Sequence, residues 1–416
     1  MKRRHLLQSS AALAALAGFG WSPRMARAAA GERKFLFLFA SGAWDSTFLD
    51  PKHDSSYVDM NANTASIRTN GLTYTGGADL PSATRFFDSW GSRTAIVRGI
   101  DAHSVGHDSG RKLTLTGTSA SSYPDWGTLL ADAGSGDYPL PHLVFSGPVF
   151  PGTRGGAVVR AGGGTLLDLI DGSLSGRADA PAPALDQVSD AMVDDYVYQQ
   201  VASFAAQRGA LPGVGRVRSE ALLDNTERAM EIEGRRFEAG LDDLGSSLAD
   251  QAIKATELMR LGLSRTAMIG IPGGWDTHGD NTPQTPQWDD LYDALDQLML
   301  HLAITPGLAT RWLIDEVVVV CLSEFGRTPG FNGSGGKDHW PYNSALVVGS
   351  GVRGNQVVGA TDDALIGVPI DFSTGQPSSS GDLLGSEHLG TALLELGGLD
   401  PARHLPGVQV LDALLA

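Results

Sequence analysis

Six short runs of apolar residues recur along the chain, and each is long enough to form one buried strand. The first, at residues 34–40, is almost entirely apolar and ends at Ser41-Gly42, and the run at 317–320 consists of four valines. A strand that is buried on both faces of a sheet has a continuous apolar sequence, whereas a half-exposed strand alternates apolar and polar residues. The runs therefore predict central strands of a parallel sheet at residues 34–40, 94–100, 142–145, 267–271, 317–320 and 344–348.

Segments with helical periodicity separate several of these runs. Residues 126–133, with Asp125 as the expected N-cap, 287–304 and 387–396 have the apolar spacing of helices that pack on a sheet. Strands that alternate with helices are typical of βαβ units. We therefore predict an α/β fold with a doubly wound, mostly parallel sheet, built as a single domain over residues 29–416.

A different pattern interrupts this alternation in the middle of the chain. Helical periodicity dominates from about residue 189 to 263, and its clearest part is the block 220–260, which is rich in Glu, Arg, Ala and Leu. The stretch Asp179-Ala180-Pro181-Ala182-Pro183 precedes it and resembles a linker. We interpret this segment as a helical insertion into the domain rather than as a separate domain.

The first 28 residues have the features of an export signal. Arg3-Arg4 precedes an apolar stretch at 11–21, and Ala26-Arg27-Ala28 supplies a small-x-small cleavage site. The stretch is too short to span a bilayer, and the paired arginines favour the Tat translocase as export partner. The alternative is an ordinary amphipathic N-terminus. We expect a periplasmic or extracellular protein with no transmembrane segment in the mature chain.

Composition narrows the class of partner. The 416 residues include 47 acidic and 31 basic side chains, which gives a formal net charge of −16. Because nucleic-acid binding depends on neutralising phosphates, this acidity argues against a nucleic-acid partner. The single cysteine, Cys321, excludes an internal disulfide, and its place in an apolar run indicates an inert core thiol.

Residues with useful chemistry follow the first two predicted strands. Asp45 comes soon after the strand at 34–40, and Asp108, Ser109 and Arg111 lie at the start of the helix expected after the strand at 94–100. In open α/β sheets, ligands bind beyond the carboxyl ends of the strands. A helix N-terminus suits an anion, and a guanidinium can hold phosphate or sulfate oxygens. The plain alternative is that the acidic and hydroxyl side chains cap a turn and a helix.

Two later strand ends combine carboxylates with histidines. Asp276-Thr277-His278 follows the strand at 267–271, Glu324 and Arg327 follow the strand at 317–320, and Asp338-His339 follows a glycine-rich loop. Carboxylate oxygens and imidazole nitrogens are acceptable ligands for Zn or Mn. A Glu324–Arg327 ion pair and a hydrogen-bonded Asp338–His339 pair would be the simpler structural account. The gathering of these groups at several strand ends favours one shared polar site that holds a divalent metal.

Together these segments resemble the DUF1501 family, whose exported members often carry Tat signals. The resemblance covers about residues 34–400 and rests on Gly274-Trp275-Asp276-Thr277-His278, on Ser323-Glu324-Phe325-Gly326-Arg327-Thr328-Pro329, and on Asp338-His339 followed by Val347-Val348-Gly349. The family is itself similar to the alkaline phosphatase/sulfatase superfamily. That likeness implies an alkaline-phosphatase-like α/β core with two metal ions.

The resemblance also implies roles for individual residues. It makes Ser109 the nucleophile and proposes as metal ligands Asp45, Asp276, His278, Glu324, Asp338 and His339. In a hydrolase of this kind, we expect Arg111 or Arg327 to hold the ester oxygens. Two departures from the superfamily pattern are visible. Phe325 replaces a histidine ligand, and Ser109-Gly110-Arg111 lacks the proline of the motif that type I sulfatases need. The second metal and formylglycine sulfatase chemistry are therefore disfavoured.

Two functions fit these observations. The first is an exported metal-dependent hydrolase that acts on a small phosphate or sulfate ester. The second is a non-catalytic envelope protein on the same scaffold, which binds an anionic ligand or an envelope polymer. The motif residues support the first, and the incomplete ligand set and the helical insertion support the second.

Overall fold

The computed structural model describes residues 32–134, 138–160, 187–209, 223, 226 and 245–416. The predicted export signal and the middle of the predicted helical insertion lie outside these residues. In the described part of the chain, no helix combines the length and the hydropathy that crossing a membrane requires.

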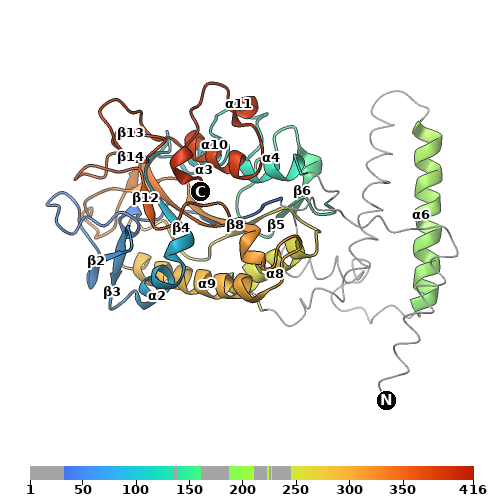
Figure 1. The fold of residues 1–416 in the computed structure, drawn as a ribbon, viewed down its shortest axis with the longest axis horizontal. Coiled ribbons are helices and arrows are strands. Elements are labelled where there is room, and N and C mark those ends of the chain that lie inside the picture. Colours follow the sequence, from blue (N-terminus) through green and yellow to red (C-terminus); the bar gives the residue numbers. More distant parts are fainter. Residues whose placement is uncertain (1–31, 135–137, 161–186, 210–222, 224–225, 227–244) are drawn as a thin grey trace, which may run out of the picture.

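An eight-stranded sheet forms the centre of the molecule (Figure 1), with the strand order β12-β4-β11-β8-β1-β7-β5-β6. Only β11 runs against its neighbours, while every other adjacent pair is parallel. The strands are β1 (Lys34–Ala40), β4 (Thr94–Asp101), β5 (His142–Val144), β6 (Val158–Arg160), β7 (Thr266–Gly270), β8 (Val317–Ser323), β11 (Tyr342–Gly349) and β12 (Gln356–Val358). The predicted α/β fold with a mostly parallel sheet is confirmed.

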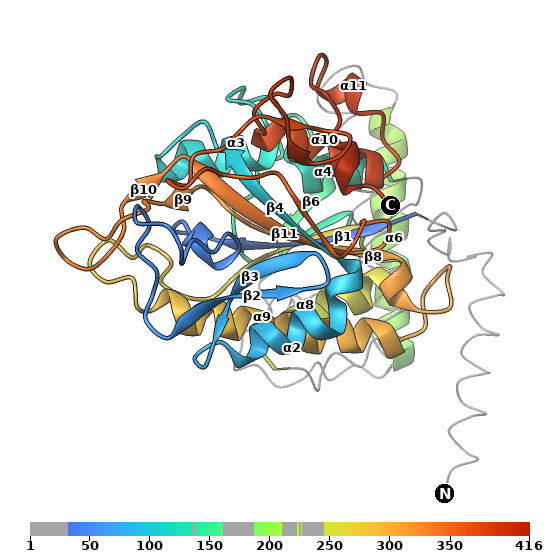
Figure 2. The ribbon, with the colours of Figure 1, turned by 60° about the vertical axis from the view of Figure 1, so that its left-hand side comes forward.

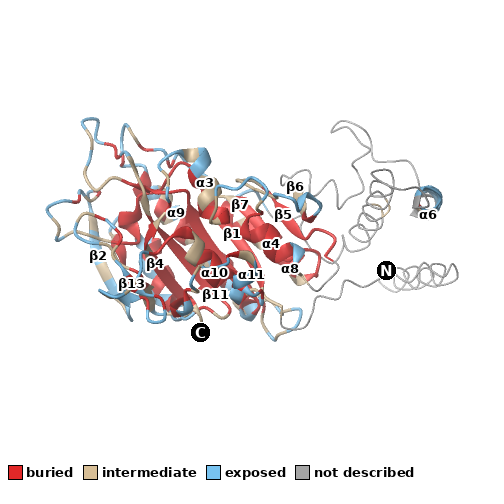
Figure 3. Cartoon of the chain, turned by 90° about the horizontal axis from the view of Figure 1, so that it is seen from above, coloured by how far each residue is buried: buried red, intermediate tan, exposed pale blue. Residues whose placement is uncertain are grey.

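Helices cover both faces of this sheet, as Figures 1 and 2 show. One layer contains α2 (Pro81–Trp90), α8 (Leu248–Arg260) and α9 (Gln284–Ile304), and the other contains α3 (His107–Thr116), α4 (Trp126–Asp132), α10 (Ser386–Leu396) and α11 (Pro401–His404). Strand β1 divides its side chains between the two cores, with Leu36 and Leu38 in one and Phe37 and Phe39 in the other. The central strands of the sheet are buried (Figure 3), which explains their continuous apolar runs.

Smaller elements surround the main sheet. A hairpin joins β2 (Thr64–Thr69) to β3 (Leu72–Gly77) through Asn70-Gly71, and both turn residues have positive φ, as a tight hairpin turn requires. The remaining short elements are β9 (Gly326–Arg327), β10 (His339–Trp340), β13 (Ile370–Asp371), β14 (Gln376–Pro377), and the 3-10 turns η1 (Ser46–Phe48), η2 (Gly91–Arg93), η3 (Gly155–Ala157), η7 (Leu313–Asp315) and η8 (Asp412–Leu414). The apolar runs do not predict the β2–β3 hairpin, because strand β2 is largely exposed and has no continuous apolar sequence.

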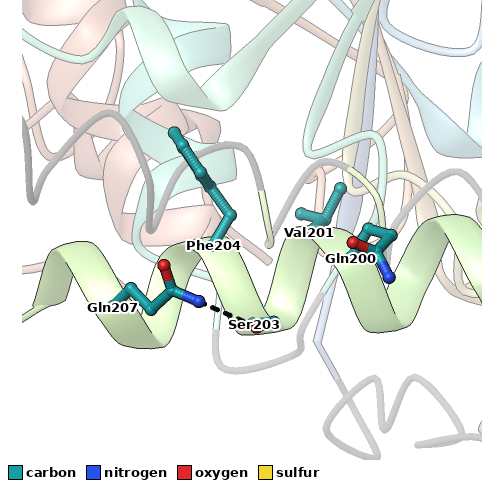
Figure 4. Close-up of a pocket in the computed structure, with 5 residues that line it drawn as sticks. All are labelled: Gln200, Val201, Ser203, Phe204 and Gln207. Atoms are coloured by element: carbon teal, nitrogen blue, oxygen red, sulfur yellow. Dashed lines mark hydrogen bonds between the residues drawn. The ribbon is translucent and has the colours of Figure 1, made fainter.

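One long helix, α6 (Gln187–Gly209), falls within the predicted helical insertion and stands beside the α/β core in Figure 1. Its side chains line a pocket of about 470 Å³ (Figure 4), formed by Gln200, Val201, Ser203, Phe204 and Gln207. A hydrogen bond of 3.2 Å joins Gln207 Nε2 to Ser203 Oγ. These five described lining residues include no titratable side chain.

The topology brings five chain segments to one edge of the sheet. Strands β1, β4, β7 and β8 run in the same direction, so their carboxyl ends meet there. Because β11 is reversed, it begins at that edge, and β10 comes immediately before it. The loops after the four parallel strands and the residues around β10 therefore surround a common space, where an α/β sheet is expected to bind its ligand.

Candidate metal centre

Four side chains meet at this edge, and we call them the His–Asp centre: His107, Asp276, His278 and His339. His107 is the first residue of α3, Asp276 and His278 lie in the loop after β7, and His339 lies in β10. One ligand atom from each of His107, Asp276 and His339 lies within 4.8 Å of the others. Asp276 Oδ1 is 3.2 Å from His278 Nε2 and 3.7 Å from His339 Nε2, and Asp276 Oδ2 is 3.6 Å from His107 Nε2.

All three histidines are oriented in the same way. The Nδ1 atom of each ring contacts an oxygen acceptor, which leaves Nε2 directed at the centre. The acceptors are Glu324 Oε1 for His107 (2.9 Å), Asp338 Oδ1 for His278 (2.9 Å) and the Val105 carbonyl for His339 (2.6 Å). A carbonyl or carboxylate can only accept, so Nδ1 carries the proton and Nε2 of the neutral ring keeps a lone pair. Metal-binding histidines are held in this manner.

A short contact between two rings shows why a cation fits here. His278 Nε2 lies 2.9 Å from His339 Nε2. With both Nδ1 atoms protonated, two lone pairs face each other at this distance, and they repel unless a proton or a metal ion lies between them. Burial lowers the pKa of His339, and the positive charge of Arg327 lowers it further. The neutral ring is the form that binds metals, so the donor set of three imidazoles and one carboxylate suits Zn or Mn.

The His–Asp centre is open to solvent. The side chain of Asp276 is 50% exposed and that of His278 is 43% exposed, while His107 and His339 are about half as accessible. Structural zinc sites are closed by four protein ligands, whereas catalytic sites keep a position for water or substrate. The exposure of these ligands is therefore typical of a site that meets a ligand from solution.

A buried arginine fixes Asp276. Arg327 has no exposed side-chain surface, and its Nη2 donates to Asp276 Oδ1 at 2.6 Å. Its other N–H groups donate to backbone carbonyls, including those of Ala43 (2.8 Å) and Lys337 (3.0 Å). Partial burial raises the pKa of the Asp276 carboxyl, but the hydrogen bond and charge of Arg327 outweigh this and lower it. The structure thus shows that Arg327 holds the Asp276 carboxylate in place, and its predicted contact with substrate oxygens stays a prediction.

Glu324 lies behind the centre rather than within it. Its carboxylate is fully buried and accepts from the Gly42 N–H at 2.7 Å and from Ser323 Oγ at 3.2 Å, besides orienting His107. Phe325 follows it, and the buried phenyl ring lies 5.2 Å from the ring of His107 and 4.5 Å from that of His339. This ring closes one side of the centre with an apolar wall. Like Glu324, Asp338 lies behind the centre, and among the described contacts it reaches the centre through His278 Nδ1.

Asp45 lies among other partners. Its Oδ1 caps η1 by accepting from the Thr47 N–H at 3.0 Å, while Oδ2 accepts from Asn281 Nδ2 at 2.8 Å and lies 2.9 Å from Lys337 Nζ. All of these interactions are buried. The structure gives Asp45 no contact with the four residues of the His–Asp centre among the described interactions, and its role as a ligand stays a prediction.

Helix α3 carries the two remaining predicted residues. Arg111 is four positions after His107, so both lie on the same helix face, and Arg111 Nε is 3.7 Å from Glu324 Oε1. Ser109 Oγ donates to the Gly106 carbonyl at 3.1 Å and contacts Ser104 Oγ at 2.6 Å. No described hydrogen bond joins Ser109 to the His–Asp centre.

His107 is the residue that the sequence analysis missed. Its signal was present, because it opens the helix that contains Ser109 and stands one helical turn before Arg111. The structure therefore adds one nitrogen donor to the predicted set Asp276, His278 and His339.

The loop before α3 is fastened by another histidine, which leads to a testable pH dependence. His103 contacts Asp101 Oδ2 (3.4 Å) and Glu387 Oε2 (3.2 Å), and hydrogen bonds to Asp101 and then Glu387 raise its pKa to about 10. Because the pKa of His103 is higher in the folded than in the unfolded protein, its protonation stabilises the fold. This contribution is complete below the unfolded pKa near 6.5, and it is lost as the pH rises through the folded pKa of about 10. We expect His103→Asn, which tolerates the positive φ of 54°, to lower Tm by a few degrees at pH 6 and by less at pH 10. Thermal melts at both pH values measure this, and an equal loss at both would contradict it.

The fold and the site together define an α/β protein with a solvent-open cluster of histidines and an aspartate at the carboxyl edge of its sheet. The sequence profile of the DUF1501 family, described as a protein of unknown function, matches residues 32–368, and the chain belongs to this family. The predicted family membership is confirmed. A comparison with curated proteins finds no match.

Solved structures of similar shape were also found. A lipoteichoic acid synthase from Listeria monocytogenes matches with 10% identity and a TM-score of 0.34 over 94% of this chain and 78% of that one. A protein from a glycosaminoglycan-metabolism locus of Bacteroides thetaiotaomicron has 10% identity and a TM-score of 0.33 over 90% and 74% of the two chains. A protein solved with its substrate D-glucosamine-2-N,6-O-disulfate has 10% identity and a TM-score of 0.35 over 89% and 77%. Scores this low carry no argument about chemistry, which must come from the site.

Proposed function

We propose that the chain is an exported, metal-dependent hydrolase of phosphate or sulfate esters that acts in the periplasm or outside the cell after Tat export. The observation that carries the proposal is the convergence of three Nε2 atoms on Asp276, each from a ring whose Nδ1 is fixed by an acceptor. Such an arrangement is typical of metal ligands. Its exposure to solvent supports a catalytic rather than a structural site.

Each part of the chain has a defined task in this proposal. His107, His278, His339 and Asp276 would hold the ion, while Glu324, Asp338 and Arg327 fix the orientation of three of these four side chains. When bound, a divalent ion such as Zn or Mn supplies a Lewis acid, which lowers the pKa of an attacking hydroxyl and stabilises negative charge on an ester oxygen.

Arg111 supports an anionic substrate. Its Nε atom is buried and makes no hydrogen bond within the described residues, although a carboxylate oxygen of Glu324 lies 3.7 Å away. The side chain as a whole is 31% exposed and lies one helical turn after His107, so its guanidinium N–H donors belong to a residue near the centre that is partly open to solvent. Arginine recognises phosphate and sulfate oxygens through such donors. We assign Arg111 to substrate binding, because it lies one helical turn after His107 on the same face of α3. We keep Ser109, in the first turn of α3, as the proposed nucleophile.

The second candidate function is a non-catalytic envelope protein that binds an anionic ligand or polymer. One observation favours it: Asp276 already has a charged partner in Arg327, and His278 has one in Asp338, so these polar groups satisfy one another within the chain. In that case the centre would hold its geometry without a metal.

Metal analysis and metal removal separate the two functions. We expect the purified protein to contain about one divalent ion per chain, because the buried Asp45 carboxylate already has Lys337 and Asn281 as partners. Turnover of aryl phosphates or aryl sulfates is expected to fall at least about tenfold after chelation and to return with Zn²⁺ or Mn²⁺. Mass spectrometry of the metal content and a chromogenic assay measure both quantities. A protein without metal and without turnover would support the binding function instead.

A further inference from the structure

A lysine ammonium is completely buried beside the His–Asp centre. The side chain of Lys337 has no exposed surface, and its Nζ lies 2.9 Å from Asp45 Oδ2, which is equally buried. Taking two charges out of water is costly, and such a pair contributes little net stability compared with apolar residues of the same size. Its presence next to the centre therefore calls for an explanation other than stability.

The backbone of Lys337 joins two segments that carry ligands. Its N–H donates to the Thr277 carbonyl at 3.1 Å, between Asp276 and His278, and its carbonyl accepts from Arg327 Nη1 at 3.0 Å. The next two residues along the chain are Asp338 and His339. Any movement of Lys337 thus displaces both the loop after β7 and the start of β10.

The adjacent glycine shows how closely these segments approach. A Cβ atom built on Gly336 would lie 2.1 Å from the His278 carbonyl oxygen and 2.4 Å from that of Thr277. No side chain fits at such a distance, so only glycine permits this approach of the two backbones. The segment that carries His339 is therefore packed directly on the segment that carries His278.

The carboxylate of Asp45 extends the same connection. Besides Lys337, its Oδ2 accepts from Asn281 Nδ2, and Asn281 Oδ1 accepts from Thr277 Oγ1 at 2.8 Å. The Asp45 N–H donates to Gln284 Oε1 at 3.1 Å, and Gln284 Nε2 donates to the Trp275 carbonyl at 3.0 Å. The loop that contains Asp276 and His278 is thus tied to Asp45 on both sides.

We propose that the Asp45–Lys337 pair positions the metal ligands, with the Lys337 ammonium serving as an internal cation that holds the two ligand-bearing segments together. Lys337 acts through its backbone hydrogen bonds to Thr277 and Arg327, and Asp45 acts through its hydrogen bonds to Asn281 and Gln284. In this proposal neither residue binds the metal. This inference rests on the proposed metal centre. It changes the role expected for Asp45 from that of a ligand to that of a support.

The chain contains a matched control at the opposite end of the same strand. Lys34 Nζ lies 2.7 Å from Glu316 Oε2, and these side chains are only 1% and 2% exposed. Lys34 begins β1, whereas Asp45 lies beyond its carboxyl end. The two pairs share chemistry and burial, but only one of them is next to the His–Asp centre. Lys34→Met therefore reproduces the loss of a buried ion pair without disturbing the ligands.

The test compares Lys337→Met with Lys34→Met in the full chain. Both substitutions are expected to lower Tm, because each leaves a buried carboxylate without its partner. Only Lys337→Met should weaken Zn²⁺ binding, by about 10- to 100-fold as for other residues that orient ligands, and change the visible absorption spectrum of the Co²⁺-substituted protein. Competition with a chromophoric chelator gives the Kd.

Asp45→Asn serves as a second variant if Lys337→Met does not fold. It keeps the shape of the side chain and removes its charge, and we expect it to weaken Zn²⁺ binding about tenfold.

Each other outcome has a distinct meaning. Equal Zn²⁺ affinities for Lys337→Met and Lys34→Met would overturn the positioning role. Tighter binding, or a second ion per chain in Lys337→Met, would also overturn it and make Asp45 a ligand that Lys337 blocks. If the unsubstituted protein binds neither Zn²⁺ nor Co²⁺, the proposed metal centre itself fails.

Discussion

Replacing His107 with alanine is expected to weaken Zn²⁺ binding by about 10²- to 10³-fold. Structural zinc sites bind with roughly 10–16 kcal/mol through four ligands, and a quarter of that free energy serves as the scale for the loss of one donor. His107 contributes its Nε2 to the cluster with Asp276 and His339, while Glu324 fixes the other ring nitrogen. Turnover of an aryl ester should fall with metal occupancy. A competition assay with a chromophoric chelator measures the Kd.

His301→Ala is the matched control for this variant. His301 lies in the last turn of α9, and its Nε2 contacts Glu257 Oε1 at 2.9 Å, so it is also a histidine held by a carboxylate. It belongs to the contact between α8 and α9 and not to the sheet edge that carries the His–Asp centre. We expect this variant to keep the metal affinity of the unsubstituted protein. If His107→Ala also kept it, His107 would not be a ligand.

The second large effect concerns Ser109. If its hydroxyl attacks the ester, Ser109→Ala is expected to lower kcat by at least about 10³-fold, because removing a nucleophile leaves only binding and charge stabilisation. In the structure this hydroxyl donates to the Gly106 carbonyl, so it must turn away from that acceptor to attack. Metal content should remain unchanged. Steady-state kinetics with an aryl phosphate or sulfate, at saturating Zn²⁺, measures the change.

Ser104→Ala provides the comparison, since Ser104 Oγ lies 2.6 Å from Ser109 Oγ and belongs to the same loop. It removes a neighbouring hydroxyl without removing the proposed nucleophile, and we expect kcat to change by less than about tenfold. If the kcat of Ser109→Ala stays within about tenfold of that of the unsubstituted protein, the nucleophile is a water molecule and not Ser109. The proposed hydrolase would survive that result, whereas the assignment of Ser109 would not.

The central strands were predictable because both faces of the sheet are covered. Strand β1 occupies residues Lys34–Ala40, as the apolar run indicated, and β8 and β11 extend their predicted runs by only a few residues. The Asp125 cap of α4 was also predicted correctly, since its side chain accepts from the Thr128 N–H. The reversed direction of β11 was not predictable, because a buried antiparallel strand has the same apolar pattern as a parallel one. The boundaries of the single domain stay a prediction.

The candidate site was predictable to the extent that it depends on strand ends. Asp276, His278 and His339 lie together because the topology brings those ends to one edge. Which carboxylate contacts the centre and which stands behind it depends on tertiary contacts. His107 and Glu324 are 217 residues apart in sequence. Asp45 pairs with Lys337, which lies 292 positions later in a loop whose conformation no local sequence pattern determines. The relation between these segments therefore required the structure.

Helix α3 has a consequence that extends beyond any one of its residues. The proposed metal ligand His107, the proposed nucleophile Ser109 and the proposed anion-binding residue Arg111 lie at the first, third and fifth positions of this helix. Because a helix moves as a rigid body, the spacing between these three groups persists even when the helix shifts relative to the sheet. Gly110 sits among them, and a Cβ there would lie 2.8 Å from the ring of Phe325. The close fit of the Phe325 ring against Gly110 thus limits how near the first turns of α3, with all three residues, can come to the segment that follows β8.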